Sequence, residues 1–165
     1  MTTRHAVVDS PLGALTLRAE DGVLSGLFMA EHRHGPPPAS FGERDDAALP
    51  AAREQLSAYF SGGLTAFDIP VVLHGTAFQQ RVWAALQDIP FGATTTYGEL
   101  AASIGAPTAS LAVGLANGRN PVSIVVPCHR VVGANGSLTG YGGGVERKRA
   151  LLDLESRVGA PGLFP

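Results

Sequence analysis

The chain contains a single cysteine, Cys128, in the tetrapeptide Pro127-Cys128-His129-Arg130. A lone thiol forms no intramolecular disulfide and holds no structural metal by itself. Cysteine is often a small, inert, buried side chain, and for this residue taken alone that interpretation stays open. The neighbours favour a nucleophile, because the proline fixes the backbone and nearby positive charge favours thiolate over thiol. Cys128 is therefore the candidate reactive group.

A nucleophilic thiol needs a base, because a free cysteine with a pKa of about 8.5 is mostly protonated at pH 7. His129 is adjacent, but an extended backbone would point it away from Cys128. We therefore expect His129 to reach the thiol through a water molecule or a bent backbone. Glu155 lies in an apolar segment, residues 150–155, and could orient the imidazole as the third member of such a set. A solvated helix residue is the alternative for Glu155.

The first half of the chain predicts a small α/β unit. Short apolar runs at 5–9, 14–18 and 23–29 are separated by turns at Ser10–Gly13 and Asp21-Gly22, which indicates an antiparallel meander. Three further segments are expected to form a surface loop, a helix with one apolar face and a returning strand: residues 33–44, 45–61 and 68–73. No reactive cluster appears in this half.

The second half predicts short helices. Thr76 can cap a helix with Phe78, Val82, Leu86 and Ile89 on one face, which Pro90 and Gly92 end. Helices at about 97–104 and 109–117, the latter capped by Thr108, are joined by a tight turn that contains glycine. This pattern is typical of a helix-turn-helix, in which the second helix enters a DNA groove, and an ordinary helical hairpin is the alternative.

Composition sets broad limits on the class of protein. The 165 residues allow one domain or two small ones, and 45% hydrophobic content supports a core. No apolar run is long enough to span a membrane, the N-terminus does not read as a signal peptide, and the lone cysteine favours a reducing, cytoplasmic setting. Residues 1–74 carry five arginines and nine acidic residues, whereas residues 75–165 carry seven basic and five acidic residues. This mild basic bias suits modest affinity for DNA.

Several motifs occur in an order that resembles the O6-alkylguanine-DNA alkyltransferase family, whose members move an alkyl group from guanine to a protein cysteine. The motifs are Thr76-Ala77-Phe78-Gln79-Gln80-Arg81-Val82-Trp83, Ile89-Pro90-Phe91-Gly92, Thr96-Tyr97-Gly98-Glu99-Leu100-Ala101, Asn120-Pro121-Val122, Pro127-Cys128-His129-Arg130 and Gly140-Tyr141-Gly142-Gly143-Gly144. The resemblance is strong from about Gly75 to Glu155 and weaker before that. It implies a ribonuclease-H-like α/β scaffold domain at 1–74, with antiparallel strands and a helix, and a mainly α, winged-helix-like domain at 75–165 that carries catalysis and DNA binding.

The resemblance also implies roles for individual residues. Cys128 corresponds to the alkyl acceptor, Glu155 and His129 to a relay that acts on the thiol through a water, and Tyr97 to the tyrosine that protonates guanine and helps to turn the nucleotide out. The residues that correspond to the substrate pocket are Asn120, Arg130, Val131, Tyr141 and Gly142. From residue type alone, Tyr97 is equally a core aromatic residue, Asn120 a turn former and the glycine run a flexible turn.

The resemblance places the DNA contacts on the second helix of the helix-turn-helix. The corresponding residues are Thr108, Ala109, Ser110, Leu111, Ala112, Gly114 and Arg119. The family inserts this helix in the minor groove and fills the space of the flipped base with an arginine, where this chain has Leu111. Leucine can wedge between bases as an apolar plug, but it carries no charge and cannot pair with the orphaned base. Arg119 could supply a phosphate contact.

The predicted function is direct-reversal repair in a single turnover, moving an alkyl group from O6 of guanine, and from O4 of thymine, to Cys128 after base flipping. A non-catalytic protein that binds the lesion is the alternative, and a cysteine hydrolase using Cys128 and His129 is a third reading. We expect no cofactor and no metal, because the histidines are scattered. The expected partner is double-stranded DNA that carries O6-alkylguanine, bound by a monomer without an obligate protein partner. Clustering on DNA and the range of alkyl groups stay open.

Overall fold

A four-stranded sheet forms the first half of the computed structural model, which describes residues 2–30, 35–139 and 141–159. Strands β1 (Thr3–Val8), β2 (Leu15–Glu20) and β3 (Val23–Met29) form the predicted antiparallel meander. Asp21 and Gly22 both have positive φ, at 50° and 80°, as the predicted two-residue hairpin turn requires. Alternate residues of β2 point into the core, so this strand has one buried face.

The segment predicted as a surface loop contributes more structure than we expected, although residues 33 and 34 lie outside the described residues. Its described part forms a 3-10 helix (Pro38–Phe41) and a short strand, β4 (Glu43–Arg44), which pairs parallel to β1 and makes the sheet order β3-β2-β1-β4. Gly42 allows this pairing: its φ is 72°, and a Cβ there would lie 2.0 Å from the Thr3 carbonyl oxygen. The sheet is therefore mixed rather than purely antiparallel.

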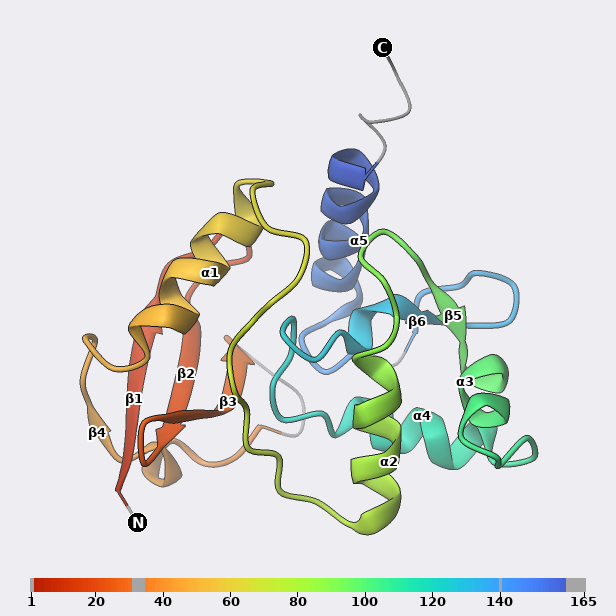
Figure 1. The fold of residues 1–165 in the computed structure, drawn as a ribbon, viewed down its shortest axis with the longest axis horizontal. Coiled ribbons are helices and arrows are strands. Elements are labelled where there is room, and N and C mark those ends of the chain that lie inside the picture. The colour runs from red at the N-terminus through yellow and green to blue at the C-terminus, as the bar shows by residue number, and fades with distance from the viewer. Residues whose placement is uncertain (1, 31–34, 140, 160–165) are drawn as a thin grey trace.

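The helix predicted at 45–61 begins later, as α1 (Pro50–Phe60). Proline is tolerated in the first turn but not in the interior of a helix, and Leu49 before it is left-handed with φ 55°. The predicted face is confirmed at Ala52, Leu56 and Tyr59, all of them buried. In Figure 1, α1 lies along the sheet beside β1 and β2.

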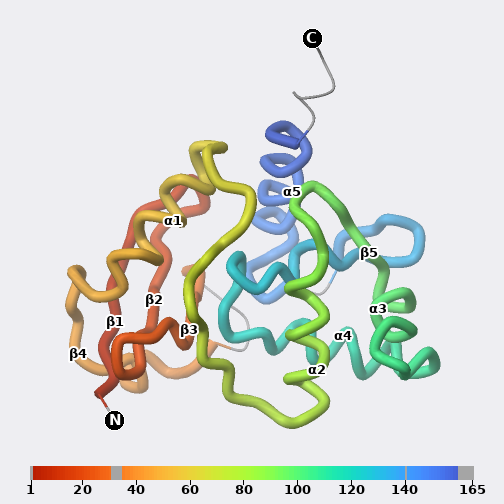
Figure 2. The backbone as a smooth tube through the Cα atoms, viewed as in Figure 1, coloured from red at the N-terminus to blue at the C-terminus, as the bar shows by residue number. Residues whose placement is uncertain are grey.

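The strand predicted at 68–73 is wrong apart from one bridge. Val71 pairs with Leu24 of β3, and the Val72 N–H donates to the Leu24 carbonyl. Pro70 has no N–H to donate, which limits pairing along this segment. Figure 2 shows the chain between α1 and α2 passing from the sheet half to the helical half. A second bridge joins Leu27 of β3 to Val122, so the same strand edge touches the segment that leads to Cys128.

The helical half contains four α-helices in its described part. They are α2 (Ala77–Leu86), α3 (Tyr97–Ser103), α4 (Ser110–Gly118) and α5 (Val145–Gly159). Thr76 caps α2, as predicted, and the structure adds that Gln79 completes a capping box. The prediction that Thr108 caps the next helix is wrong, because Thr108 lies in a turn closed by a bond from the Ala109 N–H to the Ala106 carbonyl, and α4 begins only at Ser110.

One apolar core joins both halves. Leu15 and Leu27 of the sheet, Leu56 of α1, Trp83 of α2 and Leu151 of α5 belong to the same buried cluster. Figure 1 shows α5 standing between α1 and the α2–α4 group. No described helix has both the length and the apolar character needed to cross a membrane. The shared core fixes the positions of residues that come together from both halves.

Candidate active site

Cys128 begins a 3-10 helix, Cys128–Arg130, at the end of a tightly folded loop. The apolar run at 124–126 forms turns rather than a strand, with Ile124 at φ 73°. Asn120 holds this loop: its Nδ2 donates to the Val126 carbonyl at 2.7 Å, and its Oδ1 accepts from the Val122 N–H at 3.0 Å. Because the amide of Asn120 satisfies backbone groups on both sides of the bend, the chain can turn where its apolar residues alone indicate a strand.

The 3-10 turn directs His129 and Arg130 together toward Glu155 of α5. His129 Nε2 lies 2.7 Å from Glu155 Oε2, and Arg130 donates from Nε to Oε1 at 2.8 Å and from Nη2 to Oε2 at 3.0 Å. The Tyr59 hydroxyl, from α1, donates to the same Oε2 at 2.6 Å. His129 and Glu155 are almost completely buried. The backbone at His129 is bent rather than extended, although no described hydrogen bond joins His129 to the thiol, and Glu155 is not a solvated helix residue.

Hydrogen bonds keep Glu155 ionised in spite of its burial. Burial would raise the pKa of the carboxyl, but hydrogen bonds from His129 and Arg130 outweigh it and hold the pKa at about 2. For His129, burial lowers the pKa against the opposing effect of Glu155, so the imidazole is neutral at pH 7. A carboxylate only accepts hydrogen bonds, so Nε2 carries the imidazole proton and Nδ1 keeps a lone pair. Within the described residues, Nδ1 has no hydrogen-bond partner.

The electrostatic environment of the Cys128 thiol differs from the predicted one. Burial raises the pKa of Cys128, and Asn120 and Lys148 lower it only in part. Arg130 does not promote the thiolate as expected, because its guanidinium is bound to Glu155 and, through Nη1 at 2.6 Å, to the Ile89 carbonyl. Arg130 therefore supports Glu155 rather than lining a pocket beside the sulfur. The arrangement holds a protonated thiol near a neutral, oriented imidazole.

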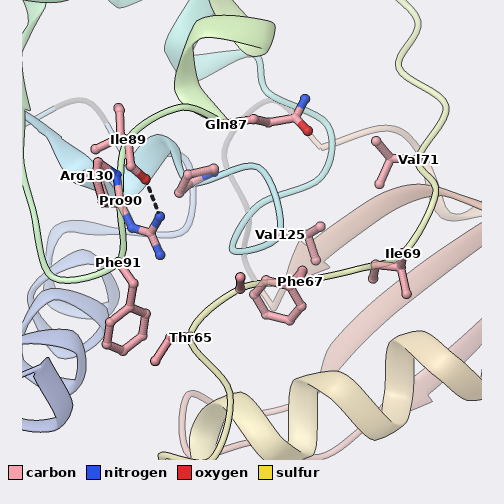
Figure 3. Close-up of a pocket in the computed structure, with 12 residues that line it drawn as sticks. Thr65, Phe67, Ile69, Val71, Gln87, Ile89, Pro90, Phe91, Val125 and Arg130 are labelled. Atoms are coloured by element: carbon pink, nitrogen blue, oxygen red, sulfur yellow. Dashed lines mark hydrogen bonds between the residues drawn. The ribbon is translucent and has the colours of Figure 1, made fainter.

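A cavity lies behind the reactive turn, where residues 65–71 pass residues 89–91. Figure 3 shows Phe67, Ile69 and Val125 on one part of its wall and Phe91 and Arg130 on another, with the Arg130 bond to Ile89 drawn as a dashed line. Cys128 does not line this cavity. Because the charge of Arg130 is already matched by Glu155, the cavity offers no free reactive group.

Lys148 is a site residue that the sequence reasoning missed. It is fully buried on α5, and its Nζ donates to the carbonyls of Val131 at 2.5 Å and Thr139 at 2.8 Å. Burial lowers its pKa to about 8, and the field of Cys128 opposes the shift. Residues 146–149 read as a charged surface run. The signal that could have found Lys148 is its helical spacing to the apolar Leu151.

Tyr97 contacts the segment that leads to Tyr141. Tyr97 is half-buried at the start of α3, and its hydroxyl donates to the Thr139 carbonyl at 3.0 Å. Tyr141 is buried, its hydroxyl has no partner among the described residues, and burial raises its pKa. Tyr141 and Gly142 line a pocket that runs to the start of α5. A Cβ on Gly143 would lie 2.4 Å from Met29 Sδ, so the glycine run also serves packing.

The predicted DNA-binding residues form the outer side of α3–α4. Leu111 is 78% exposed and Leu115 is 66% exposed, although both are large and apolar. Other predicted residues are exposed beside them: Thr108, Ser110, Ala112 and Arg119. Ala109 and Gly114 are half-buried, and a Cβ on Gly114 would lie 3.6 Å from the Tyr97 ring. The residues described show no cluster of three or more His, Cys, Asp or Glu that could hold a metal ion.

Two family models together match most of the chain. The ribonuclease-like domain of 6-O-methylguanine DNA methyltransferase matches residues 3–73, and the DNA-binding domain of the same family matches residues 77–157. These matches confirm the predicted fold class, in which a ribonuclease-like α/β half precedes a helical DNA-binding half.

Relatives match this chain over more than nine-tenths of its length. A methylated-DNA–protein-cysteine methyltransferase of Mycolicibacterium paratuberculosis is 56% identical over 153 residues, which cover 93% of this chain and 92% of that protein. One from Methanosarcina acetivorans is 49% identical, covering 92% of this chain and 97% of that protein. The crystal structure of Mycobacterium tuberculosis OGT in complex with DNA is 54% identical with a TM-score of 0.89, covering 94% of each chain.

Proposed function

Because the chain belongs to the 6-O-methylguanine DNA methyltransferase family, we propose that it repairs O6-alkylguanine in duplex DNA by transferring the alkyl group to Cys128. The observation that carries this proposal is the buried pair formed by His129 and Glu155. His129 is the residue directly after Cys128, the only cysteine of the chain. Transfer happens once per chain, because the thioether that forms is chemically stable and the reaction does not regenerate the thiol. O4-alkylthymine is a second substrate of the same chemistry. A thiol nucleophile needs a reducing compartment, so we place the reaction in the cytoplasm.

Proton transfer from the thiol is the first step of the proposed mechanism. His129 Nδ1 takes the proton, and Glu155 stabilises the imidazolium that results through Nε2. Sγ and Nδ1 share no hydrogen bond among the described residues, so the proton passes through an intervening water. Since burial raises the pKa of the thiol, the thiolate forms only when this base acts, at the moment when the alkyl carbon is in line.

Departure of guanine is the second step. Tyr97 donates its hydroxyl proton to the ring as the bond between the alkyl carbon and O6 breaks, for which it must first release the Thr139 carbonyl. Val131, Asn120, Tyr141 and Gly142 shape the space beside Cys128. The buried ammonium of Lys148 lies 5.9 Å from the Tyr97 ring and stabilises the negative charge that develops there.

Engagement of DNA uses α3 and α4 as a helix-turn-helix. A base inside a duplex must be turned out of the stack, which costs a few kcal/mol. Leu111 fills the space of the flipped nucleotide as an apolar plug, and Arg119, at the end of α4, contacts a phosphate. We propose that one free monomer binds one lesion.

A single experiment tests the function. The protein is mixed with duplex DNA that contains O6-methylguanine, and the intact protein is weighed. A gain of one methyl group and no more, absent from the Cys128→Ser variant, is the expected result. Serine has nearly the same size, so that variant should still bind the duplex. A stable complex without a gain in mass indicates the lesion-binding alternative, and repeated turnover with small substrates indicates a hydrolase.

A further inference from the structure

Asn117 connects the helix that faces DNA with the reactive turn. It lies on the inner side of α4 with 1% of its surface exposed, and its Nδ2 donates to the Cys128 carbonyl at 3.3 Å. Leu111 and Leu115 lie on the opposite, exposed side of the same helix. A shift in the position of α4 would therefore act directly on the backbone of Cys128.

The Tyr97 ring packs against the same helix, since a Cβ on Gly114, one turn before Asn117, would lie 3.6 Å from it. Burial raises the pKa of the Tyr97 phenol, and hydrogen bonds with Thr139 and Asn117 oppose this rise. An amide nitrogen carries two hydrogens, so Asn117 Nδ2 can serve the Cys128 carbonyl and the Tyr97 oxygen together. A donor to the phenol oxygen polarises the hydroxyl and makes it a stronger donor in turn.

Packing alone does not explain an asparagine at residue 117, because burying its amide costs free energy. Its Oδ1 is buried and has no hydrogen-bond partner among the described residues. An unpaired buried acceptor destabilises a protein, whereas a leucine of similar volume carries no such acceptor. The neighbouring core positions of α4, Val113 and Ala116, are indeed apolar. The retained amide therefore points to a role that only a hydrogen-bonding group performs.

We propose that Asn117 is a positioning residue for alkyl transfer, which holds the Cys128 carbonyl and the Tyr97 hydroxyl so that the sulfur and the phenol face the same guanine. This inference rests on the proposed function. As the S–C bond forms and the C–O6 bond breaks, the electron pair of the broken bond passes to guanine. A ring nitrogen then takes the Tyr97 proton, while the thiol proton has gone to His129. The resulting phenolate can then accept a hydrogen bond from Asn117 Nδ2.

A double-mutant cycle tests the inference. Single-turnover methyl transfer from duplex DNA is timed by intact mass for the wild type, Asn117→Leu, Tyr97→Phe and the double variant. We expect Asn117→Leu to slow transfer at least tenfold, but to slow the Tyr97→Phe protein by less than about twofold, because groups that act as a unit are not additive. Losses that multiply in the double variant overturn the inference. Asn117→Asp, which keeps the shape and lacks the donor, replaces Asn117→Leu if the leucine variant does not fold.

Val113→Ala is the matched control for a purely structural effect. It removes buried volume one turn before Asn117 on α4. The side chain of Val113 is apolar and forms no hydrogen bond with Cys128 or Tyr97. The substitution should lower the melting temperature, and its effect on the rate should be equal with and without Tyr97. An Asn117 variant that behaves like Val113→Ala contradicts the positioning role. Failure of the wild type to gain a methyl group contradicts instead the proposed function, so the two failures are distinct.

Discussion

The buried cluster around Glu155 and the outer face of α4 reverse the usual distribution of polar and apolar groups. In the cluster, Glu155, Arg130 and His129 lie inside the core, and the Glu155 carboxylate accepts hydrogen bonds from both of the other side chains. On α4, Leu111 and Leu115 face outward with most of their surface exposed. A buried charge is tolerated only when it is paired, and an exposed apolar face is commonly an interaction surface. We propose that each exception marks a different part of the function, with chemistry inside and DNA contact outside.

The largest expected effect comes from Glu155→Gln. This change leaves Arg130 buried without its counter-charge and costs about 3–5 kcal/mol in the free energy of unfolding. Transfer should also slow roughly 100-fold, because the imidazole loses the negative charge that stabilises its protonated form. Urea unfolding and single-turnover kinetics measure the two effects. The matched control is Glu54→Gln on the exposed side of α1, which should change stability by less than about 0.5 kcal/mol.

A second prediction tests whether the cluster acts as one relay. His129→Ala and Glu155→Gln should each slow methyl transfer strongly, and the double variant should be little slower than the slower single variant. Single-turnover rates of the four proteins give the answer. Two losses that simply multiply would show that His129 and Glu155 act independently, despite the 2.7 Å contact.

Acid should weaken the cluster in a defined range. The folded pKa of Glu155 is about 2, below its ordinary value of 4.5, so its contribution is present above pH 4.5 and is lost as the pH falls toward 2. The loss amounts to about 3 kcal/mol of unfolding free energy. Urea titrations at pH 6 and pH 3 measure the part of this loss, about 2 kcal/mol, that occurs between those two pH values. The Glu155→Gln variant should lack this part of the pH dependence, and an equal slope in both proteins would contradict the assignment.

The smallest expected effect belongs to the exposed face. Leu111→Arg should leave the free energy of unfolding within about 0.5 kcal/mol, because the side chain is 78% exposed. It should tighten binding to duplex DNA and steepen the dependence of log K on log salt by about 0.9, the value for one added phosphate contact. Fluorescence anisotropy at several salt concentrations measures this.

Two comparisons sharpen the Leu111 result. Reaction with free O6-alkylguanine base should be unchanged, because that substrate needs no extrusion. Glu99→Gln, at the exposed start of α3, provides a neighbouring change of charge by one unit. An unchanged salt slope in Leu111→Arg would mean that residue 111 does not face DNA.

Local signals in the sequence predicted the elements where a single residue decides the backbone. The helix cap at Thr76 and the Asp21-Gly22 turn are confirmed, because both depend on neighbours within three residues. The helix expected from residue 45 begins only at Pro50, because proline is tolerated in the first turn of a helix but not in its interior. Residues 124–126 do not form the strand that their apolar pattern favours, because the amide of Asn120 holds the chain in a bend there.

The sequence by itself determined the nucleophile, its histidine neighbour and the helix that presents Leu111, because residue type and short-range periodicity define each of them. Only the tertiary structure decided that Tyr59 shares an oxygen of Glu155 across 96 positions of the chain, that Lys148 is buried, and that Asn117 reaches Cys128. The physical reason is that burial and pairing depend on which distant side chain faces a group. Packing of the sheet half, α5 and the helical half around one core sets those partners, and no local pattern contains them.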